Sequence, residues 1–190
     1  MGKNRKYVQN DYYFGQKNCK SYLETITEVS KSMGRKLSKF VEKSNGKLIG
    51  KEFDILRGRL GVYVSAFDYF NSAVEILSNN IVSSNNNVCN IMGGHAEVTD
   101  KYVDEIDDRI ANCRSLIYST NKKVSELEDG AKEKEKRVLA GYRASLTELL
   151  NEKKTMEELI ESIAAADSAG VGTITDVLAK VNDVKSKMMY

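Results

Sequence analysis

Between residues 49 and 81 the chain carries an unbroken apolar stripe. Its members stand alternately four and three residues apart: Ile49, Phe53, Leu56, Leu60, Tyr63, Phe67, Phe70, Val74, Leu77 and Ile81. A repeat of about 3.5 residues is typical of a helix that packs lengthwise along other helices. At about 1.5 Å per residue the stripe is roughly 50 Å long, which is too long for a helix inside a compact globule of 190 residues. The stripe therefore predicts an elongated helical bundle.

The composition favours helices over strands. The chain contains no proline, although average usage near 5% predicts about nine in a chain of this length. Proline breaks helix interiors, so its absence permits long uninterrupted helices. β-Branched residues nowhere alternate with polar ones in runs bounded by turns, which is the pattern of a half-buried strand. We therefore expect an all-α protein without strands.

The same helical period recurs along the rest of the chain. It predicts helices over about residues 12–43, 47–83, 99–128, 131–166 and 173–187. Their apolar faces include Val29, Met33 and Phe40 or Val41 in the first, Ile106, Ile110 and Cys113 in the third, and Leu139, Leu149, Met156, Ile160 and Ile163 in the fourth, where Lys153 interrupts the period. Breaks are expected at Asn45-Gly46, at Ser83–Asn87 together with Gly93-Gly94, and at the small residues Ser168–Gly172. Thr99 or Asp100 is placed to cap the third helix. Because each helix can bury its stripe only against another, we predict one elongated antiparallel bundle of four to five long helices, a single domain over residues 1–190.

Glycines inside the second predicted helix are unusual. Gly58 and Gly61, with Gly50 near its start, each cost a helix interior about 1 kcal/mol relative to alanine. One interpretation is that another backbone approaches closely along that face. The alternative is that a helix held by its ten-residue stripe tolerates them.

Charge is unevenly distributed along the sequence. Residues 1–51 hold 12 Lys/Arg and 4 Asp/Glu, a balance of +8, and the remaining residues have a balance of −6. Such asymmetry can mark a nucleic-acid or membrane surface. We favour a basic first helix that packs beside acidic residues of the same bundle. The acidic cluster just after residue 96 is either that counterpart or a solvated face; it comprises Glu97, Asp100, Asp104, Glu105, Asp107 and Asp108.

Residues that could carry chemistry are few. The single histidine, His95, follows Gly93-Gly94 in a predicted loop, and no phosphate-binding, metalloprotease or nucleophile-elbow motif is present. Cys19, Cys89 and Cys113 lack the spacing of metal ligands, and Cys113 falls on the apolar side of the third helix. We therefore predict a protein that is not an enzyme, with no catalytic residue, no cofactor and no metal site.

Targeting signals of the usual kinds are missing from the sequence. Residues 1–15 are basic but contain no apolar run like that of a secretory signal, and no stretch approaches the 18 apolar residues of a membrane span. If the protein is exported, we expect a route that does not use a cleaved signal peptide.

The segment around the start of the second helix resembles the signature of the LXG domain, the N-terminal targeting domain of polymorphic toxins exported by the type VII secretion system of Gram-positive bacteria. Leu48 and Gly50 match the Leu and Gly that name the family, and Phe53 stands where a large apolar residue is usual. The acidic segment 103–110 is similar to the one that opens the family's third helix. Ala164–Ala169 followed by 174–178 resembles its small-residue joint and final helix. The related WXG100 proteins carry Trp-x-Gly in a helical hairpin, whereas this chain has no tryptophan.

The resemblance implies a non-catalytic targeting or adaptor module. Such a module pairs with small α-helical partner proteins and presents a joint surface to the type VII secretion machinery, so that the protein is made in the cytoplasm and is secreted or reaches the cell surface. The candidate partner-binding residues are Leu48, Gly50, Phe53, Leu56, Gly58 and Gly61. Two alternatives stay open: a self-associating coiled-coil scaffold that forms a homo-oligomer, and a basic binder of nucleic acid or a membrane surface.

Overall fold

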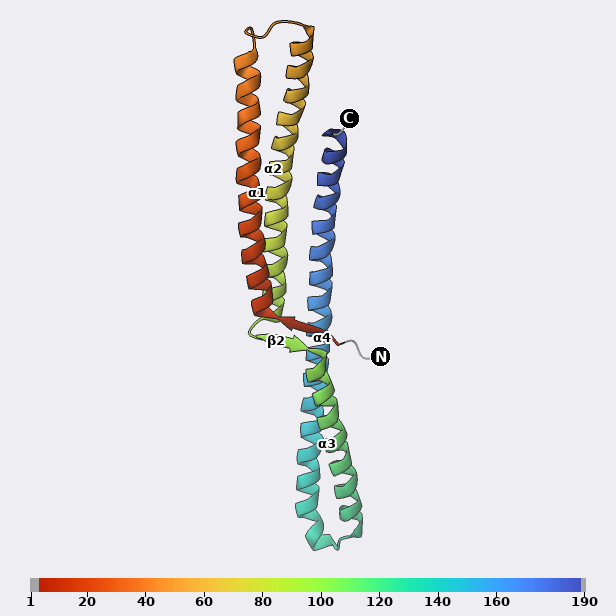
Figure 1. Ribbon diagram of the computed structural model, residues 1–190. Helices are drawn as coiled ribbons and strands as arrows, with labels where there is room; N and C mark the ends of the chain where they lie inside the picture. The colour runs from red at the N-terminus through yellow and green to blue at the C-terminus, as the bar shows by residue number, and fades with distance from the viewer. Residues whose placement is uncertain (1–3, 189–190) are drawn as a thin grey trace. The chain divides into compact units, whose positions relative to one another are not determined.

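The structure is a computed structural model that describes the backbone of residues 4–188 and their side chains except those of residues 129, 131, 184, 187 and 188. Within this range the elements are β1 (Lys6–Val8), α1 (Gln9–Ser44), α2 (Lys51–Met92), β2 (Glu97–Thr99), α3 (Asp100–Glu126) and α4 (Asp129–Met188) (Figure 1). The all-α prediction is confirmed, with one small two-stranded sheet added.

The chain divides into two compact units, and α4 contributes a long segment to each. One unit holds the residues up to Gln9 and residues 91–165; the other holds residues 10–90 and those from 166 onward. The single domain expected over residues 1–190 remains a prediction.

The first unit is built on a helical hairpin of α3 and the first part of α4. Both helices bury the positions that their apolar period predicted. On α3 these are Ile106, Ile110 and Cys113, and on α4 they are Leu139, Leu149, Met156, Ile160 and Ile163. The Cys113 thiol also donates a hydrogen bond to the Tyr142 carbonyl oxygen, with 3.2 Å between the sulfur and oxygen atoms. Thr99 caps α3 as expected, since its side chain accepts a hydrogen bond from the Tyr102 amide.

A two-stranded antiparallel sheet ties the N-terminal segment to the start of α3. Tyr7 of β1 lies opposite the buried Val98 of β2. Next to the sheet, the Arg5 guanidinium donates through Nε and Nη2 to the Asp100 carboxylate, and the Arg5 amide donates to it over 2.7 Å. The expectation of no strands was wrong, because three-residue strands are too short to show alternation and their pairing joins segments about 90 residues apart in sequence.

The acidic residues around the start of α3 have their partners inside the first unit. Besides the Arg5–Asp100 pair, Glu97 contacts Lys6 over 3.1 Å and Asp107 contacts Lys153 over 2.6 Å. The hydrogen bond to Asp107 raises the pKa of Lys153, the residue that interrupts the apolar period of α4. The expected pairing of this cluster with the basic first helix was therefore wrong for these three acidic residues: their partners come from the N-terminal segment and from α4.

The Arg5–Asp100 pair should hold the N-terminal strand in place. We expect Arg5→Met to increase amide hydrogen exchange in β1 and β2, because a half-buried, charge-assisted set of hydrogen bonds contributes about 1.5–3 kcal/mol. Lys6→Met is the matched control: the Lys6–Glu97 pair is solvent-exposed, and such pairs contribute about 0–1 kcal/mol. Equal exchange rates in the two variants would contradict this role of Arg5.

The second unit contains α1, most of α2 and the C-terminal part of α4. Small residues bring α1 and α2 together: Ser30 and Gly34 are buried on α1, and Ala66 and Ala73 are buried on α2. A Cβ atom at Gly34 would lie 3.4 Å from the Cβ atom of Phe67. The two helices form a hairpin joined by the turn at residues 45–50, and the C-terminal part of α4 runs beside them but ends before that turn (Figure 1).

Close contact between α2 and α4 explains two wrong helix boundaries. Breaks were expected at Ser83–Asn87 and at Ser168–Gly172, yet α2 runs on to Met92 and α4 is one helix from Asp129 to Met188. A Cβ atom at Gly170 would lie 1.8 Å from the Ser84 Oγ atom and 2.8 Å from its Cβ. The small residues therefore let two helices approach each other and do not end them.

This contact makes Gly170 sensitive to a single added methyl group. We expect Gly170→Ala to lower the free energy of unfolding by about 1–2 kcal/mol, because the helices must separate to accept it. The matched control is Gly172→Ala, which faces open space and should raise stability by about 0.5–1 kcal/mol through helix propensity. Urea denaturation followed by circular dichroism measures both. Stabilisation by both substitutions would show that α2 and α4 are not in close contact.

Candidate partner-binding surface

The Leu-x-Gly segment forms the turn of the α1–α2 hairpin. The amide of Leu48 donates to the Ser44 carbonyl oxygen over 3.0 Å, closing the end of α1. Gly50 has φ 132°, a conformation that L side chains rarely adopt. Its carbonyl oxygen accepts the Asp54 amide and begins α2. Leu48 and Gly50, two of the predicted site residues, thus shape the turn that leads into α2.

Arg57 holds this turn in place through hydrogen bonds to its backbone. It was not among the predicted site residues. Its Nη1 donates to the carbonyl oxygens of Ser44, over 3.2 Å, and Leu48, over 2.7 Å, while Nη2 contacts the Asp54 carboxylate. The unpaired carbonyl oxygens at the end of a helix need donors, and a basic residue two turns into α2 supplies them. A signal for it was present in the sequence, as an arginine nine residues after Leu48.

The apolar stripe of α2 is covered unevenly. Near the turn all its members except the half-buried Leu60 are exposed: Ile49 to 84%, and Phe53, Leu56 and Tyr63 to between 37 and 42%. Further along α2, Phe67 and Phe70 are half-buried and Val74 is buried. The same is true of the predicted stripe of α1, where Val29, Met33 and Phe40 are exposed. The half of the hairpin near the turn therefore presents a large apolar surface to solvent.

Gly58 and Gly61 face open space on another side of α2. No atom of the neighbouring elements lies within 4 Å of a Cβ built at either position, so the chain itself provides no closely packed neighbour there. Gly58 stands two residues after Leu56 and Gly61 two before Tyr63, and residues two apart do not share a helix face. The six predicted residues thus form three groups: the turn, the stripe and the glycine side.

An apolar groove lies between the α1–α2 hairpin and the C-terminal part of α4. Its volume is about 480 Å³, and its walls come from α1, α2 and the last turns of α4. The apolar side chains that line it include Ile26, Val29, Met33, Phe67, Phe70 and Val181. The groove opens toward the exposed part of the stripe, since Met33 and Phe67 stand at its end nearest the turn. None of these groove residues was predicted as part of a site.

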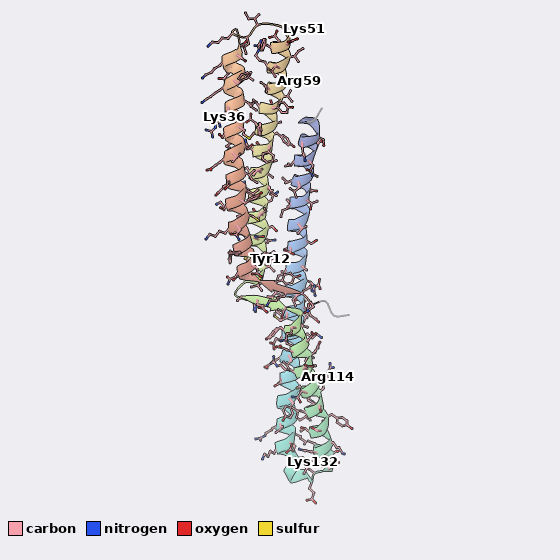
Figure 2. The ribbon with its side chains drawn as sticks, viewed as in Figure 1. Tyr12, Lys36, Lys51, Arg59, Arg114 and Lys132 are labelled. Carbon is pink, nitrogen blue, oxygen red and sulfur yellow. The ribbon has the colours of Figure 1, made fainter. Side chains whose placement is uncertain are left out.

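The same part of the hairpin is strongly basic. Residues 29–63 hold nine Lys/Arg and three Asp/Glu, a balance of +6. All the basic residues except Arg57 are exposed, and Figure 2 shows Lys36 on α1 and Lys51 and Arg59 on α2. Among the ion pairs of the described residues in this stretch, only that of Arg57 with Asp54 involves one of the nine. Apolar side chains and unneutralised positive charge therefore lie together.

The single histidine, His95, and an acid-paired tyrosine, Tyr102, lie on either side of β2. His95 is exposed in the loop before β2, where its amide donates to the Met92 carbonyl oxygen. Tyr102 donates to Glu152 over 2.6 Å, which raises the pKa of the tyrosine. Among the described residues, no three His, Cys, Asp or Glu side chains gather where they could hold a metal ion.

The chain matches no family model, no curated protein and no solved structure. No helix in the described part of the chain combines the length and the apolar character needed to cross a membrane.

Proposed function

We propose that this protein is a targeting or adaptor module of the LXG type, which pairs with small α-helical partner proteins for export by a type VII secretion system. The observation that carries the proposal is the exposed half of the α2 stripe. A contiguous apolar surface at the end of a long hairpin is typical of a protein-interaction site.

The location of the Leu-x-Gly triplet supports the same proposal. Leu48 and Gly50 stand in the turn of a helical hairpin, and the related WXG100 proteins carry their Trp-x-Gly triplet in a helical hairpin. Phe53 and Leu56 follow on the first turns of α2 as exposed apolar side chains. In this proposal the turn sets the geometry of the two helix ends, and the stripe beside it meets the partner.

The export route follows from the resemblance and forms part of the proposal. The protein is made in the cytoplasm, joins its partner there and leaves with it, without a cleaved signal peptide. It acts by binding and performs no catalysis.

Self-association is the second candidate, because two copies could cover each other's exposed stripes. The charge balance of +6 over residues 29–63 works against it, since a symmetric pairing would place like charges together. Sedimentation of the purified chain distinguishes the two: a stable homodimer favours the scaffold, whereas a monomer favours a separate partner.

Co-expression with small helical proteins encoded beside this chain's gene tests the proposed function. We expect at least one of them to co-purify with the chain. Phe53→Ala should weaken that complex by about 10-fold or more, because the loss of a buried aromatic contact costs over 1 kcal/mol at an interface. Gly61→Leu should weaken it only if the partner also contacts the glycine side.

Ile76→Ala is the matched control, because Ile76 is an exposed apolar residue of α2 outside the stripe. Circular dichroism should show that all three variants keep their helices. A chain that forms no complex with any of these proteins would contradict the proposed function.

A further inference from the structure

The groove at the end of α4 is shaped for a helix. Two of its walls are the antiparallel helices α1 and α2. The third wall is the C-terminal part of α4, which contributes Val181 and Lys185. Its lining is almost entirely apolar: Val29, Met33, Phe67 and Phe70 face it. A helix laid in line with α4 would bury these side chains, as apolar helix faces do when they enter a groove.

The groove continues along the hairpin toward the turn. On α1, Phe40 stands seven residues after Met33, and on α2, Tyr63 and Leu56 stand seven and fourteen residues before Phe70. Residues seven apart return to the same helix face, so these exposed side chains extend the floor of the groove. From Phe53 to Phe70 the floor is about 25 Å long at 1.5 Å per residue, which is room for about five helical turns.

A buried polar group without a partner lies in the wall of the groove. Ser30 is 5% exposed, and no hydrogen bond to its hydroxyl oxygen is found among the described residues. Buried hydroxyl groups are nearly always hydrogen-bonded in native proteins. Ser30 belongs to the residues that line the groove, but its hydroxyl oxygen is enclosed by the chain, so the surface that the groove offers to an occupant is apolar at that point.

The charges around the groove indicate the chemistry of the occupant. Lys36 stands seven residues after Val29, and Arg59 stands seven before Ala66, so both return to the side of the groove. Lys185 lines it directly. A helix with acidic residues beside its apolar face would place carboxylates next to these cations. A second copy of this hairpin would instead bring its own excess of positive charge.

We propose that this groove seats an acidic amphipathic helix of a partner protein, aligned with α4 and covering Met33, Phe67 and the exposed stripe beyond them. The inference rests on the proposed function, because it specifies where the partner's helix binds and that this helix carries negative charge. The groove is lined by apolar side chains, and the cations Lys36, Arg59 and Lys185 stand at its rim.

Two synthetic peptides of about 18 residues test the proposal. Both carry leucine at heptad positions a and d; one has glutamate at the flanking positions and the other has lysine there. Fluorescence anisotropy with the full chain measures their affinities at low salt. We expect the glutamate peptide to bind at least about 10-fold more tightly, and its affinity to fall as NaCl rises from about 50 to about 300 mM.

Matched variants locate the binding site. Met33→Asp places a carboxylate in the groove and should weaken the glutamate peptide by about 10-fold or more. The control is Ile76→Asp. Ile76 is about as exposed as Met33 but lies on α2 outside the apolar stripe, so this substitution should leave the affinity unchanged. Lys36→Glu with Arg59→Glu should remove the preference for the glutamate peptide, whereas the control pair Lys17→Glu with Lys20→Glu should not.

Several results would overturn the proposal. These are equal affinities for the two peptides, no binding of either, or binding that Met33→Asp leaves unchanged. A homodimer broken by Met33→Asp would assign the groove to a second copy. Binding to vesicles of anionic lipid, lost in Met33→Asp, with no peptide bound would assign it to a membrane surface.

The same experiments separate the groove proposal from the proposed function. If a helical protein co-purifies while neither peptide binds, the groove assignment is wrong and the proposed function stands. If the peptides bind while no helical protein co-purifies, the proposed function is wrong.

Discussion

One apolar stripe runs along α2, and α1 and the described part of α4 cover only part of it. From Phe67 onward the stripe is half-buried or buried, with α1 on one side and α4 on the other. Toward the turn the residues of the stripe are exposed, except for the half-buried Leu60. Because apolar burial is the main favourable term in helix packing, this unequal coverage determines both where the second unit is stable and where it can accept a partner.

The covered end depends on small residues. Gly170 lies so close to Ser84 that a single Cβ would clash, and Gly34 lies against Phe67. Tight approach of this kind fixes the position of α4 along α2. The apolar groove lies further along α4, where Val181 and Lys185 form its third wall. The groove thus lies about three to four helical turns along α4 from this packing contact.

The sequence predicted the helices of the first unit well because their stripes are covered along their whole length. Ile106, Ile110, Cys113, Leu149 and Ile160 are all buried where the period placed them. Helix ends were harder to predict, because Ser83–Asn87 and Ser168–Gly172 have the composition of loops and serve as close helix contacts. No single-sequence pattern distinguishes these roles, because the answer depends on which other segment lies opposite.

The candidate site was predicted only in part for a similar reason. Leu48 and Gly50 could be placed at a turn from their neighbours, and Phe53 and Leu56 on a stripe from their spacing. The groove joins residues from α1, α2 and α4 that are up to about 160 positions apart, and its existence depends on how α4 lies beside the hairpin. The Arg5–Asp100 pair likewise joins distant segments. Local periodicity carries no information on either arrangement.

Amide hydrogen exchange along α2 in the isolated chain tests the central claim most directly. Two helices alone should open locally more often than three packed together. The account predicts that amides of residues 53–63 exchange at least about 10-fold faster than those of residues 73–89. Equal protection along the whole of α2 would show that the stripe near the turn is already covered, and it would contradict the account.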